Sequence, residues 1–151
     1  MLYSELLELH NFLRWIVLAA ALVAICVAAS GWIGSKPVSP ALRRFGTIFV
    51  STMDVQLLVG LILYLAASPI TRMAFQNMSA AMKDHELRFF TVEHTTCMLI
   101  AVIVAHVGAV MSRKATTDRA KYRAAAIAYT ISFLVMLAGI PWWRPLLRWG
   151  G

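Results

Sequence analysis

The chain has 151 residues, 60% of them hydrophobic, with a formal net charge of +7 and a mean hydropathy of +0.72. An ordinary soluble domain is only about 45–50% apolar, so the composition excludes a soluble globular fold of this size. The Lys and Arg residues stand almost entirely between apolar segments. There they act as topology signals, which argues against nucleic acid as a partner.

Four apolar segments are each long enough to cross a hydrocarbon core, which takes about 20 helical residues. They cover residues 12–32, 45–65, 89–111 and 122–142. Aromatic residues flank these segments, as amphipathic rings do at the headgroup level of a lipid bilayer. We therefore predict an all-α integral membrane protein in which residues 1–151 form one transmembrane domain, an up-and-down four-helix bundle.

Local signals predict where these helices begin and end. Ser39 followed by Pro40 is typical of a helix start, and Pro141 ends the last helix. Asp84 and either Thr117 or Asp118 are candidate caps for the third and fourth helices. Between the second and third spans, apolar residues recur at loosely helical spacing over residues 68–88, which predicts a short amphipathic helix on the membrane surface.

The positive charges predict the orientation of the bundle. Two connections, between the first and second and between the third and fourth spans, hold Lys36, Arg43, Arg44, Arg113, Lys114, Arg119, Lys121 and Arg123. The opposite side holds Arg72, Lys83, Arg88, Arg144 and Arg148. By the positive-inside rule the first group is cytoplasmic, so both termini lie on the outer side.

An ionisable side chain inside a span costs several kcal/mol to bury, so each one is a hypothesis about function. His10 and Arg14 stand at the outer start of the first helix, and Glu93 and His94 at that of the third. Gly60 of the second helix lies at about the same depth, counted at 1.5 Å per residue. The first and third helices of such a bundle are diagonal neighbours, so His10 and His94 would have the geometry for a haem b, one imidazole on each face.

The neighbouring residues suit such a site. Arg14 would pair with a propionate, and Gly60 would give the porphyrin edge room against a helix. Glu93 would be a second partner on the propionate side or a hydrogen-bond acceptor for a ligand imidazole. Alternatively, His10 and His94 bind no cofactor and simply hydrogen-bond to backbone or carboxylate groups.

Asp54 and His106 form a second polar set, nearer the inner side. Both lie about 10–13 Å from the inner ends of the second and third helices, which are adjacent, so we predict an ion pair. A structural pair that sets helix register is the simplest interpretation. The alternatives to a structural role are a proton relay and an inner cofactor site that uses His106. Two bis-histidine sites are excluded, because only one partner histidine is available from another span.

The segments His10–Trp15, Asp54–Gly60 and Phe89–His94 resemble a family of short bacterial membrane proteins that are labelled cytochrome b-like, and the resemblance covers most of the chain. It implies haem and electron transfer, and it favours His10 with His94 as the axial pair. It also implies a bacterial inner membrane, and the outer side that the positive-inside rule assigns to both termini is then the periplasm. The residues that it singles out are His10, Arg14, Gln56, Gly60, Glu93 and His94.

We therefore expect a b-type cytochrome with one haem near the outer face, which exchanges electrons with quinones, a soluble carrier or a neighbouring membrane complex. The alternative is a cofactor-free accessory subunit of a larger respiratory or photosynthetic complex. A small proton-coupled transporter that works through Asp54 and His106 is disfavoured, because the sequence shows no inverted repeat or broken helix.

Overall fold

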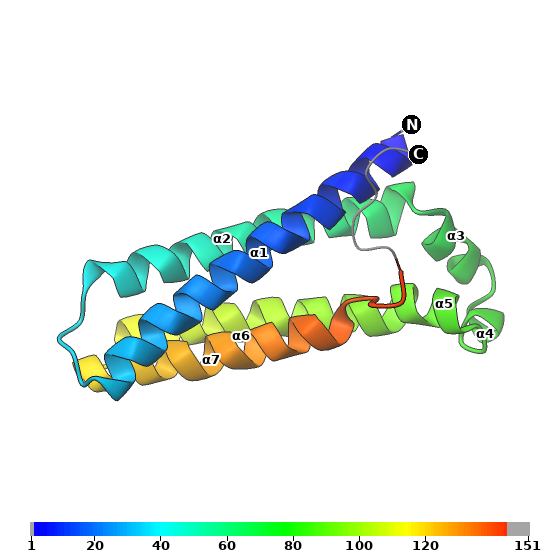
Figure 1. Ribbon diagram of the computed structural model, residues 1–151. Helices are drawn as coiled ribbons and strands as arrows, with labels where there is room; N and C mark the ends of the chain where they lie inside the picture. Colours follow the sequence, from blue (N-terminus) through cyan, green and yellow to red (C-terminus); the bar gives the residue numbers. More distant parts are fainter. Residues whose placement is uncertain (1, 145–151) are drawn as a thin grey trace.

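The computed structural model describes residues 2–144, which contain helices and no β-strand (Figure 1). Four helical segments are long and apolar enough to cross a membrane: Leu2–Ile33, Pro40–Ala67, His85–Lys114 and Asp118–Gly139. The predicted all-α fold with four membrane-spanning helices is confirmed. Of the charged residues used to predict orientation, Arg148 lies outside the described residues.

The bundle is of the up-and-down type (Figure 1). Its elements are, in chain order, α1 (Leu2–Ile33), α2 (Pro40–Ile62), the π-helix η1 (Leu63–Ala67), α3 (Pro69–Gln76), α4 (Met78–Ala81), α5 (His85–Arg88), the π-helix η2 (Phe89–Glu93), α6 (His94–Lys114) and α7 (Asp118–Gly139). The start of α1, the segment α3–α5 and the last turn of α7 lie at one end, here called the terminal end (Figure 1). The connections 34–39 and 115–117 lie at the other, the basic end.

The helices pack in a ring in which α1 contacts α2 and α7, and α6 contacts α7 and α2, so that α1 and α6 are diagonal. The α6–α7 contact is the most extensive and the α2–α6 contact the least. Ala101, Ala105 and Ala109 recur every four residues on α6 and are buried. A Cβ added at Gly108 would collide with Ala128 of α7. Close packing of such small residues is what associates helices in lipid, where burial of apolar surface adds little.

The helix ends follow local chemistry. Asp84 accepts a hydrogen bond from the N–H of Leu87 (2.8 Å), and Thr117 accepts one from that of Ala120 (3.2 Å). Pro40 is in the first turn of α2, as predicted. The last helix ends at Gly139, short of the predicted residue 142, because a residue that precedes proline disfavours the helical conformation and Ile140 is extended.

Two further boundaries differ from the prediction. The first helix begins at Leu2 instead of residue 12, because apolar content marks the lipid-crossing part of a helix, whereas hydrogen bonding continues beyond it. The segment 68–88 forms three short helices, α3, α4 and α5, instead of one. The first two are separated at Asn77, whose backbone leaves the helical conformation and whose side chain accepts a hydrogen bond from the N–H of Ala80 (3.0 Å), which caps the new helix.

Candidate functional site

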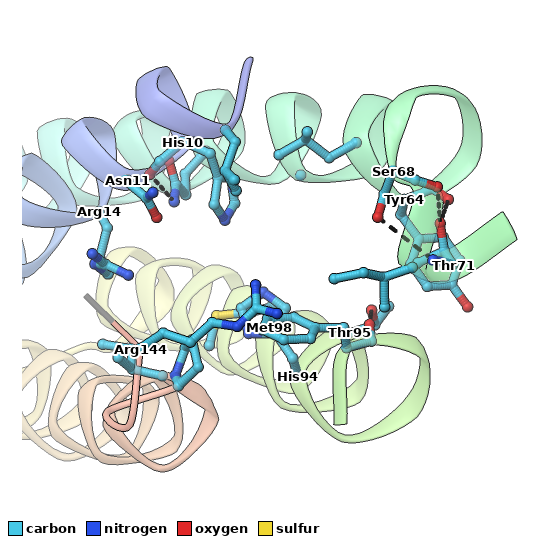
Figure 2. Close-up of a pocket in the computed structure, with 18 of the residues that line it drawn as sticks. His10, Asn11, Arg14, Tyr64, Ser68, Thr71, His94, Thr95, Met98 and Arg144 are labelled. Atoms are coloured by element: carbon cyan, nitrogen blue, oxygen red, sulfur yellow. Dashed lines mark hydrogen bonds between the residues drawn. The ribbon is translucent and has the colours of Figure 1, made fainter. Parts of the chain in front are cut away.

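A cavity of about 140 Å³ lies inside the bundle at the terminal end (Figure 2). His10 and Arg14 of α1, Gln56 and Gly60 of α2 and His94 of α6 are among the residues that line it. A smaller cavity of about 60 Å³ adjoins it and is also lined by His10 and His94. The space around the two imidazoles is therefore not filled by packed aliphatic side chains.

His10 and His94 face each other across the diagonal of the bundle. Their ring centroids are 6.2 Å apart, and the ring planes are inclined at 70°. Nδ1 of His94 lies 2.7 Å from the carbonyl oxygen of Gly139. A carbonyl oxygen only accepts, so Nδ1 carries the proton, and in the neutral imidazole Nε2 keeps a lone pair for a ligand.

The carbonyl that orients His94 is free because of where α7 ends. The last carbonyls of a helix have no partner within it, and α7 ends at Gly139. The absence of a side chain at Gly139 also lets α6 approach. A Cβ there would lie 2.6 Å from Cε of Met98 and 2.8 Å from Cβ of Cys97. The sequence Gly139–Pro141 thus supplies both the acceptor and the close contact.

His10 is positioned by α2. Gln56 and Gly60 are four residues apart and share one face of that helix. Nε2 of Gln56 donates a hydrogen bond to the backbone oxygen of His10 (3.0 Å), and a Cβ added at Gly60 would lie 3.2 Å from Cε1 of His10. Gly60 therefore makes room for the imidazole itself, where the sequence suggested room for a porphyrin edge.

Two buried polar atoms beside the cavity have no hydrogen-bond partner within residues 2–144. They are Nδ1 of His10 and Oε1 of Gln56. A buried polar atom without a partner costs stability, and native structures seldom retain one without a functional reason. These two atoms therefore mark the wall formed by α1 and α2 as a candidate binding surface.

The two π-helices lie next to the site and were not predicted. The hydroxyl of Tyr64 in η1 donates to the backbone oxygen of Thr91 in η2 (3.0 Å), which joins the two π-helices. Thr71 donates to the backbone oxygen of Tyr64 (2.8 Å), as Figure 2 shows. π-Turns occur frequently at functional sites. The apolar pattern gives no signal for them, because one inserted residue leaves the segment equally hydrophobic.

The charged groups of the site differ in part from the expected ones. Arg14 lines the cavity as predicted, and so does Arg144, which the sequence suggested only as a topology signal. The guanidinium of Arg144 lies over the ring of Phe90 (4.5 Å to the centroid) and pairs with Glu86. Glu93 does not line the cavity. Its carboxylate pairs with Nε of Arg88 (2.7 Å), so the structure gives it no direct role at the histidines.

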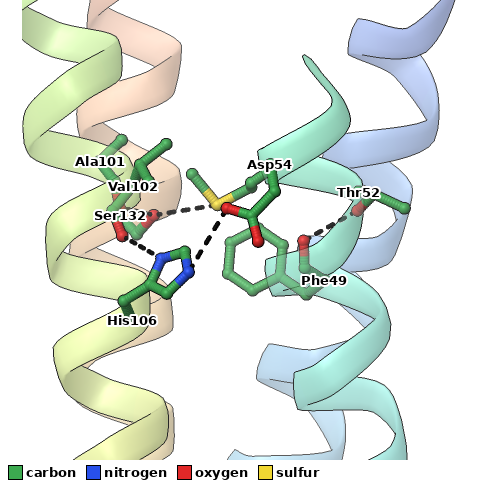
Figure 3. Close-up of polar contacts among 8 residues, drawn as sticks. Phe49, Thr52, Asp54, Ala101, Val102, His106 and Ser132 are labelled. Atoms are coloured by element: carbon green, nitrogen blue, oxygen red, sulfur yellow. Dashed lines mark hydrogen bonds and ion pairs between the residues drawn. The ribbon is translucent and has the colours of Figure 1, made fainter. Parts of the chain in front are cut away.

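Asp54 and His106 lie together, as the sequence suggests, but at the surface of the bundle. Oδ1 of Asp54 and Nε2 of His106 are 3.4 Å apart, and the two side chains are 51% and 45% exposed (Figure 3). Nδ1 of His106 lies 3.0 Å from the backbone oxygen of Val102, one turn earlier in α6. The pair therefore links α2 to α6 on the outside of their contact.

Comparisons of the chain with models of known protein families, with curated proteins and with solved structures found no match. In the described part of the chain, no group of three or more His, Cys, Asp or Glu side chains could hold a metal ion. What the site offers instead is two imidazoles on opposite sides of a cavity, with two arginines at its wall.

Proposed function

We propose that the chain is a membrane-bound b-type cytochrome that holds one haem between His10 and His94 and transfers electrons. The separation of the two imidazoles carries this proposal. A metal–imidazole bond is about 2 Å long, and adding the distance from nitrogen to ring centre on each side gives a centroid separation of roughly 6 Å. The separation of 6.2 Å agrees with this requirement.

Three further features support the fit. Because Nδ1 of His94 is hydrogen-bonded to Gly139, its Nε2 would be available to bind the haem iron. Oε1 of Gln56 is a buried acceptor on the helix beside His10, suited to a proton on Nδ1 of that ligand. Arg14 and Arg144 would hold the propionates by charge-assisted hydrogen bonds. A haem bound here would supply a one-electron iron couple.

The cellular setting is part of the proposal. The excess of Lys and Arg at the basic end supports a cytoplasmic position for that end. The terminal end, with the proposed haem, would then face the periplasm of a bacterial inner membrane, as the resemblance to cytochrome b-like proteins implies. Its redox partners would be quinones, a soluble carrier or a neighbouring membrane complex.

The reduced-minus-oxidised optical spectrum of protein purified after haem-replete expression tests the proposal. We expect a b-type spectrum that is lost in the variants His10→Ala and His94→Ala. The matched control is His106→Ala, on the same helix as His94 but outside the cavity, which should keep the full spectrum. A colourless wild-type protein, or a His94→Ala protein with an unchanged spectrum, would contradict haem binding at this site.

A second candidate function, an accessory subunit of a larger membrane complex, is favoured by the surface pair Asp54–His106. Ionisable side chains within spans almost always face a bundle interior or a water-filled cavity. The side chains of Asp54 on α2 and His106 on α6 are about half exposed. A helix of another subunit that carries hydrogen-bonding side chains would place both of them in an interior if it packed over them. Purification in mild detergent should then yield a stoichiometric partner protein that is lost in the variant Asp54→Leu but kept in Val55→Leu. A partner that co-purifies equally with both variants would count against an interface at this pair.

A further inference from the structure

The basic end contains a cavity that the proposed cytochrome function does not use. Its volume is about 330 Å³, compared with about 140 Å³ for the cavity between the histidines. It lies among α2, α6 and α7, next to the connections 34–39 and 115–117. Val38, Leu42 and Ala109 form an apolar part of the wall, and hydroxyl and cationic side chains stand among them.

Three cationic side chains line this cavity, one from each helix: Arg43, Arg113 and Lys121. Within residues 2–144, neither Arg43 nor Arg113 forms an ion pair, and no carboxylate lines the cavity. Lys121 is 4.0 Å from Asp118, one turn earlier in α7, at the limit of an ion pair. Cations that converge without carboxylates raise the local positive potential, which an anion lowers.

The hydroxyl of Tyr129 provides a second, independent observation. Tyr129 is only 3% exposed and lines the cavity, yet its hydroxyl forms no hydrogen bond within the described residues. The hydroxyl lies against Gly46, where an added Cβ would be 2.5 Å from it. Tyr122, two turns earlier in the same helix, differs, because its hydroxyl accepts from the N–H of Ser39 (3.1 Å) and donates to the oxygen of Pro37 (3.2 Å).

We propose that this cavity binds a phosphate group, held by Arg43, Arg113 and Lys121 and by a hydrogen bond from the hydroxyl of Tyr129. Phosphate oxygens accept several charge-assisted hydrogen bonds at once, and arginine matches their geometry. Basic pockets between transmembrane helices on the cytoplasmic side are known to bind anionic lipid head groups. The phosphate therefore belongs either to an anionic phospholipid or to a soluble phosphate compound. In the first case the acyl chains of the lipid would lie against the apolar part of the cavity wall.

Native mass spectrometry of the delipidated full-length protein, titrated with phosphatidylglycerol, phosphatidylcholine or inorganic phosphate, tests this site. Removing cationic contacts should weaken phosphatidylglycerol binding about fivefold for Arg43→Gln and about thirtyfold for Arg43→Gln with Arg113→Gln. The control, Arg44→Gln with Lys114→Gln, removes the same charge from neighbouring residues outside the cavity and should leave binding within twofold. Tyr129→Phe, which removes no charge, should weaken binding about tenfold.

The outcomes separate the two sources of phosphate. Binding of phosphatidylglycerol alone identifies a lipid site, whereas binding of inorganic phosphate with the same dependence on Arg43 and Arg113 identifies a soluble ligand. Equal effects of the two double variants, or equal binding of phosphatidylcholine, would overturn the proposal. The site lies at the opposite end from His10 and His94, and the readout is the mass of bound lipid or phosphate, so this test does not depend on the cytochrome proposal.

Discussion

His94 and His106 stand on the same helix, yet the structure gives them opposite surroundings. His94 lines an internal cavity and faces His10, with its Nδ1 held by the free carbonyl at the end of α7. His106 is 45% exposed and meets Asp54 on the outside of the α2–α6 contact. Both are imidazoles within an apolar span, so the residue type does not explain the difference.

Helix rotation explains it. The two histidines are twelve residues apart, which at 3.6 residues per turn rotates the second by about 120° from the first. On α2 the same holds for Gln56 and Asp54, which are two residues apart and therefore about 200° apart around the helix. Gln56 faces His10 and Asp54 faces outward. The face that a polar residue occupies thus separates a residue that lines the cavity from one that forms a surface pair.

Among substitutions of residues that contact these histidines, Gly60→Val should have the largest effect, because it displaces His10 in the cavity and leaves the surface pair Asp54–His106 untouched. The added Cβ would lie 3.2 Å from Cε1 of His10, and its two methyl groups need space that the imidazole occupies. Overpacking of this kind costs about 1–3 kcal/mol, so we expect haem affinity to fall roughly tenfold or more. Haem titration of the apoprotein, followed by absorbance, measures it.

Two controls sharpen that result. Gly60→Ala adds only the Cβ, which a shift of a few tenths of an ångström accommodates, so its affinity should fall between those of the wild type and the valine variant. Val55→Leu changes an exposed apolar residue on the same helix and should leave haem affinity unchanged. Normal haem binding by Gly60→Val would show that haem binding does not require the imidazole of His10 in the position that it occupies in this structure.

Gln56→Leu should have a moderate effect, a decrease in the free energy of unfolding. The substitution keeps the approximate volume of the side chain but removes the hydrogen bond from Nε2 to the backbone of His10. Such a bond contributes about 1 kcal/mol, and removal of the unpaired Oε1 offsets part of that loss, so the free energy of unfolding should fall by less than about 1 kcal/mol. Denaturation of the apoprotein in mixed micelles measures this change. The comparison is Thr52→Val, one turn earlier on α2, which alters a polar side chain that hydrogen-bonds within its own helix, to the backbone oxygen of Phe49.

Much of the fold could be predicted from the sequence, because apolar length alone determines which segments cross a bilayer. The diagonal arrangement of α1 and α6 also follows from the chain order, because helices that are consecutive in the chain are neighbours in an up-and-down bundle. The starting residue of α1 could not be predicted, since Glu5 and Glu8 end the apolar segment without ending the helix. Nor could the break at Asn77, which depends on one side chain capping the next turn.

The candidate site was predictable in outline only. His10, Arg14 and His94 could be grouped by depth, and all three line the cavity. The assignment of Glu93 to this group did not anticipate its ion pair with Arg88, because a helix next to a π-turn no longer follows the usual count of residues per turn. Arg144 was missed because its approach to Phe90 requires the chain to turn back after Pro141, which a linear pattern does not show.

The smallest expected effect concerns the surface pair. Asp54→Asn and His106→Gln, made singly and together, form a double-mutant cycle whose interaction free energy should be about 0.5 kcal/mol, the usual size for polar contacts between helices in a membrane protein. Unfolding of the isolated protein in mixed micelles gives this value. The 3.4 Å separation and half-exposed side chains leave little reason for a stronger interaction while nothing covers the pair. A coupling above about 2 kcal/mol would be typical of a buried pair and would remove the distinction between the two histidines of α6.

If a partner subunit does cover this face, the coupling should rise in the assembled complex and stay small in the isolated chain, because removing water and lipid from a charged pair strengthens the interaction between its members.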